Sequence, residues 1–338
     1  MRTSSVPSNG RDEASPTAAS STFTMSGIRR GSRRPSRRGM PPSKNIFPHP
    51  NLKRGEHIVS EIIYEKKDGI GWITLNRPEE LNAMNDAMLA GLDEAFAAAE
   101  PDLEVKVVVV KGAGKDFSVG QDLSGVDTLE VLSEPGENLT IKRRMEAERR
   151  RNRRWEYIFN LAKPTIAQVH GYCLGTGCYL AMVCDITIAS EDALFGDPLL
   201  RMGLLPHMPL WTWLIGIKKT KELLYTGRYM DAMEAEQFGL INKAVPRDKL
   251  EEEVTRLATG ISLLPGDALA PCKDAINSVM EARGLGGAWR FTNNMQLVMQ
   301  QRTMEPGEFN FFKVRDKKGL KPAIAERDAL FKQLYEET

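Results

Sequence analysis

The chain has 338 residues, of which 41% are hydrophobic and 27% charged, a composition typical of a globular protein. Its formal net charge is +1, and no apolar run reaches the roughly 18 residues of a membrane helix, so we expect no membrane span. The start of the chain lacks the apolar core of a signal peptide, so we expect a cytoplasmic protein, with a mitochondrial location as the alternative. The cysteines form no C-x-x-C pair, which indicates small buried residues and no metal site: Cys173, Cys178, Cys184 and Cys272.

The basic charge is concentrated in residues 1–55, which hold eleven Lys and Arg against two Asp and Glu. This segment is rich in Ser, Pro, Arg and Gly and has no helical or strand period, so we predict a disordered basic extension. The run GIRRGSRRPSRRG would suit a nucleic-acid arm, or the segment could be a transit peptide. We favour a dispensable extension, with Met25 or Met40 as alternative starts, and do not expect nucleic acid as a partner.

Strands and helices alternate after the extension. Two strands come first, His57–Glu65 and Gly71–Asn76, with a turn at residues 67–69. A helix over Asp86–Glu100 and a buried strand over Lys106–Lys111 follow, and a second helix spans about residues 137–161. Further strands are predicted at Pro164–His170, Ile186–Ala189 and Ile241–Val245. This alternation predicts an α/β fold, with a largely helical second half.

Two glycine-bearing segments could supply chemistry, KDFSVGQDLSG (115–125) and VHGYCLGTGCYLAMVCDITIA (169–189). In the second, a buried strand leads through G-T-G into an apolar helix, whose first N–H groups have no partner within the helix. Such groups stabilise an anion or an oxyanion, and two converging donors are what thioester chemistry requires. Nucleotide sites and plain turns also use G-x-G, but no G-x-G-x-x-G occurs here, which disfavours a dinucleotide fold.

Six segments, in this order and spacing, resemble the hallmarks of the crotonase (enoyl-CoA hydratase/isomerase) superfamily. They are WITLNRPEELNAM (72–84), FSVGQDL (117–123), KPTIAQVHGYCLGTG (163–177), CDITIA (184–189), FGDP (195–198) and TGRYMDAMEAEQFGLINKAVP (226–246). The resemblance implies a spiral of ββα units with a helical C-terminal region. It also implies an acyl-CoA ligand, with coenzyme A as part of the substrate and no separate cofactor, and a homotrimer or a hexamer of two trimers. We therefore divide the chain into the extension, an acyl-CoA-binding core (56–260) and a C-terminal helical region for assembly and site capping (261–338).

By position, the resemblance places an oxyanion hole at the backbone N–H groups of Gln121 and Thr176. The family usually has glycine where Thr176 stands, and a backbone donor survives that change. The other residues expected to bind the coenzyme A thioester are Val119, Gly120, Asp122, Leu123 and Gly175.

The sequence departs from the family pattern at the two glutamates that hydratases carry. Tyr179 and Leu199 occupy those positions, and hydration of an enoyl thioester needs both a base and an acid. Asp197 could be a displaced base or a turn-capping residue, and His207 could be a base, a nucleophile or a structural histidine. Tyr179 could donate a hydrogen bond to the acyl group or line the pocket.

The sequence therefore predicts an enoyl-CoA hydratase-like enzyme, a lyase by family, whose reaction type stays open. One alternative is an acyl-CoA hydrolase or lyase that uses His207 or Asp197. Another is a non-catalytic homologue that binds coenzyme A or RNA. The arginine-rich run 142–155 is explained by a solvated helix or by contact with coenzyme A phosphates.

Overall fold

A six-stranded sheet runs through the part of the chain that this computed structural model describes, residues 61–124, 140–206, 209–299 and 304–335. β1 and β2 pair antiparallel, and the predicted turn between them includes Asp68 and Gly69, which have φ of 52° and 79°. The remaining neighbours in the sheet are parallel. In spatial order the strands are β1 (Ile62–Lys67), β2 (Ile70–Leu75), β3 (Val107–Gly112), β4 (Thr165–Val169), β6 (Ile186–Ser190) and β9 (Lys243–Val245).

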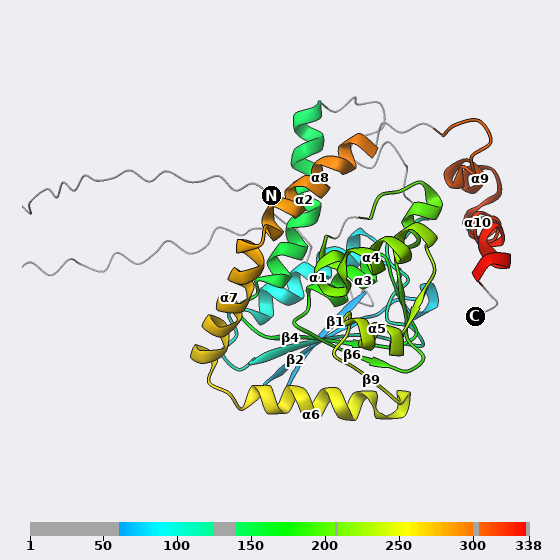
Figure 1. The fold of residues 1–338 in the computed structure, drawn as a ribbon. Helices are drawn as coiled ribbons and strands as arrows, with labels where there is room; N and C mark the ends of the chain where they lie inside the picture. Colours follow the sequence, from blue (N-terminus) through cyan, green and yellow to red (C-terminus); the bar gives the residue numbers. More distant parts are fainter. Residues whose placement is uncertain (1–60, 125–139, 207–208, 300–303, 336–338) are drawn as a thin grey trace, which may run out of the picture. The chain divides into compact units, whose positions relative to one another are not determined.

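Helices cover both faces of this sheet, which explains the unbroken apolar run in β3. The side chains of Val107–Val110 are all fully buried. Because side chains alternate between the faces of a strand, Val107 and Val109 join the cluster that includes α6 (Leu250–Ser262). The intervening valines join the larger cluster that includes α1 (Asp86–Ala99) on the opposite face. Figure 1 shows α6 along one side of the sheet and α1 on the other.

A second, three-stranded sheet consists of very short strands that we did not predict, β5 (Tyr172–Leu174), β7 (Leu194–Gly196) and β8 (Met230–Asp231). The chain passes from β4 to β5 and then into α3 (Thr176–Val183). It repeats the pattern from β6 to β7, followed by the 3-10 helix η2 (Pro198–Met202) and α4 (Leu210–Thr226). Each repeat is a ββα unit with one strand in each sheet. β5 and β7 are parallel neighbours, so the segments that follow them lie together.

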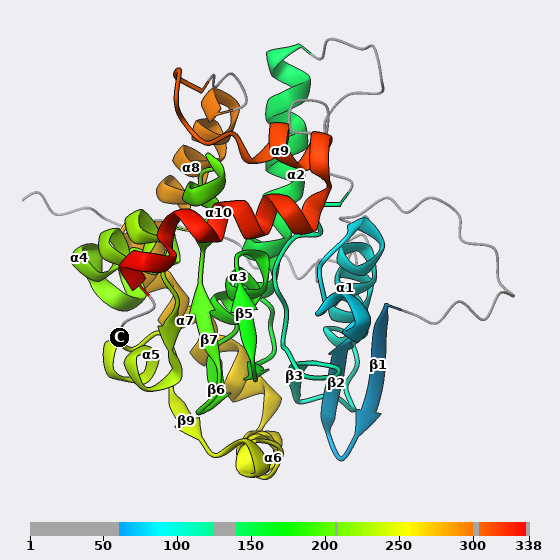
Figure 2. The ribbon, with the colours of Figure 1, turned by 90° about the vertical axis from the view of Figure 1, so that its right-hand side faces the viewer.

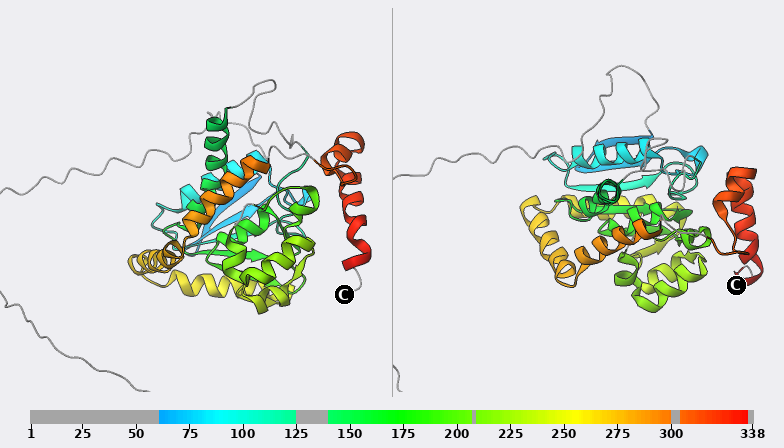
Figure 3. Two further views of the ribbon diagram at one scale, coloured as in Figure 1. Left: turned by 45° about the horizontal axis from the view of Figure 1, so that its top comes forward. Right: turned by 90° about the horizontal axis from the view of Figure 1, so that it is seen from above.

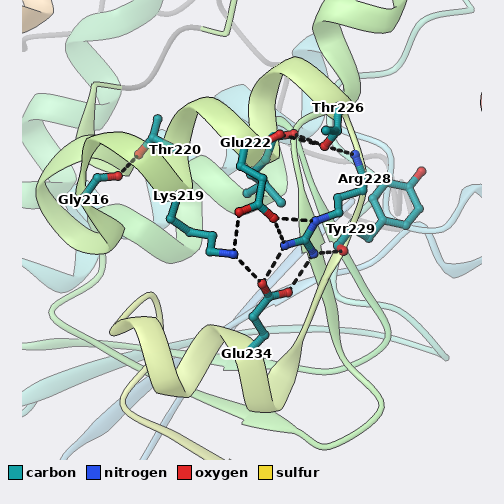
Figure 4. A network of polar contacts seen from close by, with 9 residues as sticks. Gly216, Lys219, Thr220, Glu222, Thr226, Arg228, Tyr229 and Glu234 are labelled. Carbon is teal, nitrogen blue, oxygen red and sulfur yellow. Dashed lines mark hydrogen bonds and ion pairs between the residues drawn. The ribbon is translucent and has the colours of Figure 1, made fainter. Parts of the chain in front are cut away.

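A network of charged side chains fixes the chain beside β7 (Figure 4). Glu234 of α5 (Ala232–Phe238) accepts hydrogen bonds from Lys219 at 3.0 Å and from Arg228 at 2.6 Å. Arg228 also binds Glu222 of α4. The backbone of Arg228 closely approaches Gly196 of β7, where an added Cβ would lie 3.3 Å from the carbonyl oxygen of Arg228. The network therefore helps to position the strand that leads to Asp197.

The described chain after β9 is helical, as predicted for the C-terminal region. α2 (Ile141–Phe159) and α8 (Leu285–Met299) lie side by side in Figures 1 and 3. α7 (Gly266–Ala282) is tied to the sheet by Lys273, whose Nζ donates to Asp185 Oδ2 at 2.8 Å. None of the helices in the described ranges combines the length and the apolar character that crossing a bilayer requires.

α9 (Phe311–Lys318) and α10 (Leu320–Tyr335) pack against each other, as Figure 2 shows. Arg315 of α9 donates to the carbonyl oxygen of Leu123 at 3.2 Å. Arg327 of α10 contacts the sulfur of Met202 in η2. The C-terminal helices therefore contact both the 121–124 segment and the segment that follows Asp197.

Candidate active site

Three segments that are far apart in the sequence lie side by side at the ends of the short strands. The backbone N–H of Leu174 donates to Ser118 O at 2.9 Å, and the N–H of Gly175 donates to Gly196 O at 2.8 Å. These bonds align residues 118–121, 173–176 and 194–197. The glycine segments that the sequence singled out, and the aspartate of F-G-D-P, are thus brought together by the ββα repeats.

Gly120 allows two of these segments to approach closely. Its φ is +96°, and a Cβ at this position would lie 2.7 Å from Leu174 O and 3.2 Å from Thr176 N. Only a residue without a side chain fits both the backbone conformation and the available space. The backbone N–H groups of Gln121, the next residue, and of Thr176 are therefore close neighbours.

Both of these N–H groups lack an acceptor among the described residues. Thr176 is the first residue of α3, where N–H groups have no partner within the helix. Met84 accepts from Asp122 N and donates to Gly120 O, so the trans peptide turns the N–H of Gln121 away from Met84. The result is a pair of backbone donors at the positive end of a helix, an arrangement suited to an oxyanion.

Tyr179 and Asp197 meet next to this pair of donors. Tyr179 lies three residues after Thr176 on α3, and its hydroxyl donates to Asp197 Oδ2 at 2.5 Å. The other carboxyl oxygen accepts from Leu199 N at 3.3 Å, so Asp197 also caps η2. The side chains are buried, with exposed fractions of 2% for Tyr179 and 0% for Asp197.

Burial changes the acidity of Asp197. Removal from water raises the pKa of its carboxyl to about 7, although the hydrogen bonds from Tyr179 and Leu199 act in the opposite direction. A carboxyl with this pKa is present in both protonation states near neutrality. It can therefore accept or release a proton at the pH at which most enzymes work.

Known proteins are similar to this chain over most of its length. A sequence profile described as enoyl-CoA hydratase/isomerase matches residues 65–316. The chain belongs to the enoyl-CoA hydratase/isomerase family. A Rhizobium meliloti protein named "Probable enoyl-CoA hydratase" is 34% identical over 80% of this chain and 97% of its own. A Dictyostelium discoideum protein named "Probable enoyl-CoA hydratase, mitochondrial" is 34% identical over 64% of this chain and 75% of its own.

The solved structures agree with this family assignment. The crystal structure of an enoyl-CoA hydratase/isomerase from Xanthobacter autotrophicus superimposes with a TM-score of 0.73. It is 36% identical and covers 80% of this chain and 98% of its own. The α/β fold class, a crotonase-like spiral of ββα units with a helical C-terminal region, is therefore confirmed.

Other residues that the family resemblance singled out lie in the loop around Gln121. Asp122 accepts from Arg77 at 3.0 Å and from Ser124, so its carboxylate anchors the loop. The N–H of Val119 donates to Leu81 O at 3.1 Å. These contacts fix the loop that presents the backbone N–H of Gln121.

Leu199, at one of the family's glutamate positions, has an apolar environment. It joins an apolar cluster with Leu123, Met202 and the aromatic rings of Phe311 and Phe312. This position therefore presents no acid or base. It contributes apolar surface beside the segment that carries Gln121.

The structure describes one of the two histidines near these segments, His170. His207 lies outside the described residues, so its predicted role stays a prediction. The Nε2 atom of His170 is 3.1 Å from the carbonyl oxygen of Gly114, and burial lowers the pKa of the ring. The ring of His170 thus contacts a backbone carbonyl oxygen.

Sequence reasoning missed two contacts with the site. The ring of Trp155 in α2 packs edge-on against Tyr179, with centroids 6.4 Å apart. Arg315 reaches Leu123 from far along the chain. The buried face of α2 includes the polar residues Glu148 and Asn152 before Trp155, so no apolar period in the sequence indicates this contact.

Proposed function

We propose that the protein is an acyl-CoA enzyme that binds a thioester carbonyl between the backbone N–H groups of Gln121 and Thr176. The observation that carries the proposal is the close approach of these two donors, which Gly120 permits. Neither N–H group has an acceptor among the described residues. Negative charge develops on the thioester oxygen when an enolate or a tetrahedral intermediate forms. One such donor typically lowers the barrier by roughly 3–4 kcal/mol.

The names of the relatives support an enoyl-CoA hydratase-like activity, since they are described as enoyl-CoA hydratases. The site chemistry argues for a different use of the same scaffold. Tyr179 and Leu199 replace the two family glutamates, and Leu199 lies in an apolar cluster. The described candidate for proton transfer is Asp197 with Tyr179, and His207 is a second candidate.

The remaining binding residues are proposed to act by holding the backbone donors in position. Val119, Gly120, Asp122 and Leu123 hold the segment that presents Gln121. Gly175, with φ of +49°, turns the chain into α3. Holding the Gln121 segment and turning the chain into α3 do not require a charged side chain that touches coenzyme A.

We also propose that the chain divides into the extension (1–55), which lies outside the described residues, and the acyl-CoA-binding core (56–260), and that the C-terminal region (261–338) caps the site and mediates assembly. The contacts of Arg315 with Leu123 and of Arg327 with Met202 support the capping role. Large exposed apolar side chains support assembly into trimers or hexamers, among them Ile276, Val279, Phe291 and Val298. Sedimentation analysis of the purified protein tests the assembly state.

The activity is tested by incubating the purified protein with saturated, 2-enoyl, 3-oxo and aromatic acyl-CoAs and following products by mass spectrometry. The matched variants are Asp197→Asn and His207→Ala. Conversion of a thioester by the wild type that is lost in one variant would support the proposal and identify the acid or base. Binding of acyl-CoA without any turnover would support the non-catalytic alternative, and no binding at all would contradict the proposed ligand.

A further inference from the structure

We infer that Tyr179 and Asp197 form a proton relay in which Tyr179 faces the substrate and Asp197 stores the proton. The inference rests on the proposed function, because it requires a thioester at the Gln121 and Thr176 donors. It adds the class of reaction, a proton shift at carbon that neither adds nor removes water. The argument comes from the geometry of α3 and from the contacts of the buried carboxyl.

The first step concerns the direction of the tyrosine side chain. Cα–Cβ bonds in a helix tilt toward its N-terminus, so a long side chain covers the turn before its own Cα. Tyr179 follows Thr176 by three residues in α3, and residues at this spacing share one face. Its side chain therefore leans toward the end of the helix where the N–H of Thr176 is presented.

The second step concerns the carboxyl, which is enclosed. Both oxygens of Asp197 are engaged, Oδ2 by the hydroxyl of Tyr179 and Oδ1 by the N–H of Leu199. The exposed fraction is 0% for Asp197 and 2% for Tyr179, so the relay requires the tyrosine oxygen to lie between this carboxyl and the substrate. Asp197 is thus a positioning residue and a proton store, and Tyr179 is the group that would touch the reacting carbon.

The third step concerns the charges around the pair. Tyr179 is the titratable side chain bonded to Asp197, and Trp155, which packs on Tyr179 from α2, is uncharged. Burial is the main influence on the carboxyl, and the hydrogen bonds from Tyr179 and Leu199 oppose it. The influences on the pKa of the carboxyl are therefore burial and two hydrogen bonds from neutral donors.

The proton transfer balances without any co-reactant. The bond between the α-carbon and its hydrogen breaks, and the proton moves to the tyrosine oxygen while the hydroxyl proton of Tyr179 moves to Asp197. The electron pair moves into the thioester, and the enolate oxygen is held by the two backbone donors. When the stored proton is replaced by a deuteron from D2O before the enolate is reprotonated, its return to the α-carbon gives hydrogen exchange. In a 3-enoyl thioester, protonation at the γ-carbon moves the double bond into conjugation.

One relay can hold the proton that it has removed, but it offers no separate group to activate water. Hydration needs a base for water and an acid for the α-carbon, and Leu199 cannot provide the second function. The pair therefore fits substrates with an exchangeable α-hydrogen, such as saturated and 3-enoyl thioesters.

The test is hydrogen exchange of butanoyl-CoA in D2O, followed by mass spectrometry, with but-3-enoyl-CoA as a second substrate for double-bond migration. Wild type should incorporate deuterium, and Tyr179→Phe and Asp197→Asn should each slow incorporation by roughly 100-fold or more. The rate should rise with pH through about 7 in wild type, in step with the pKa of Asp197, and Asp197→Asn should abolish this rise.

Tyr157→Phe is the matched control, because Tyr157 makes a similar phenol–carboxylate bond to Glu100 at 2.8 Å outside the site. It should exchange at the wild-type rate, and urea unfolding should show that all variants are folded. Calorimetric binding of butanoyl-CoA separates the two proposals. Binding without exchange, or wild-type exchange in Tyr179→Phe, would overturn the relay alone, whereas no binding would overturn the proposed function itself.

Discussion

Gly120→Ala is the substitution that most directly probes the approach of the two segments that carry the backbone donors. Gly120 has φ of +96°, and an added Cβ would lie 2.7 Å from Leu174 O and 3.2 Å from Thr176 N. Gly284, between α7 and α8, has the same φ of +96° with no heavy atom within 4 Å of an added Cβ. The two glycines therefore share the same positive φ and differ in their surroundings.

The magnitudes follow from this comparison. The left-handed backbone costs a side chain roughly 1–2 kcal/mol, which both alanine variants should lose in the free energy of unfolding. The contact with rigid backbone adds roughly 1–3 kcal/mol for Gly120→Ala alone. Relief of that contact moves Thr176 N away from Gln121 N, so kcat should fall roughly 100-fold in Gly120→Ala. In Gly284→Ala the kcat should stay near the wild-type value.

Urea unfolding measures the stability of both variants, and turnover of the best thioester measures their activity. Equal destabilisation of the two variants would show that the added Cβ of Gly120→Ala meets no obstacle. A wild-type kcat in a folded Gly120→Ala protein would refute the claim that this approach places the donors.

Three further predictions concern stability. Lys273→Met should lower the free energy of unfolding by about 2 kcal/mol, since it removes a largely buried charged donor from Asp185. Lys249→Met, at an exposed ion pair, should leave the free energy of unfolding near the wild-type value. The ion pairs of Glu234 lower its pKa from 4.5 to about 2, so the stabilisation that they give is present above pH 4.5 and is lost toward pH 2. In urea unfolding, Glu234→Gln should therefore lower the free energy of unfolding by about 1 kcal/mol at pH 7 and by less at pH 3. Burial raises the pKa of Asp197 from 3.8 to about 7, so the protonated carboxyl contributes fully to the free energy of unfolding below pH 3.8, and this contribution is lost as pH rises to about 7. Asp197→Asn should remove this decline when the free energy of unfolding is measured against pH. The same decline in the variant would contradict the prediction.

The local patterns of the sequence predicted the main sheet and its helices well. The run at Lys106–Lys111 became β3, and the helix predicted over Asp86–Glu100 spans Asp86–Ala99. These elements were visible because a run buried on both faces and a 3.6-residue period are each properties of neighbouring residues. The helix predicted over about 137–161 begins at Ile141 in the described residues.

The site itself was predicted only in part. The glycine segments and the helix start indicated a pair of backbone donors, because those properties are local. The bond between Tyr179 and Asp197 joins two ββα units across short strands of the second sheet, and two or three residues carry no readable period. The contact between Arg315 and Leu123 spans 192 positions and depends on how the C-terminal helices pack.

The central claim is that a thioester carbonyl lies between the N–H groups of Gln121 and Thr176. Infrared difference spectroscopy of bound acyl-CoA with a 13C-labelled carbonyl tests it without requiring turnover. Two hydrogen bonds to the oxygen should weaken the double bond, so the account predicts a carbonyl stretch at lower frequency than in water, with a smaller shift in Gly120→Ala. A bound thioester whose carbonyl stretch is unshifted, or is raised as in an apolar pocket, would contradict the account.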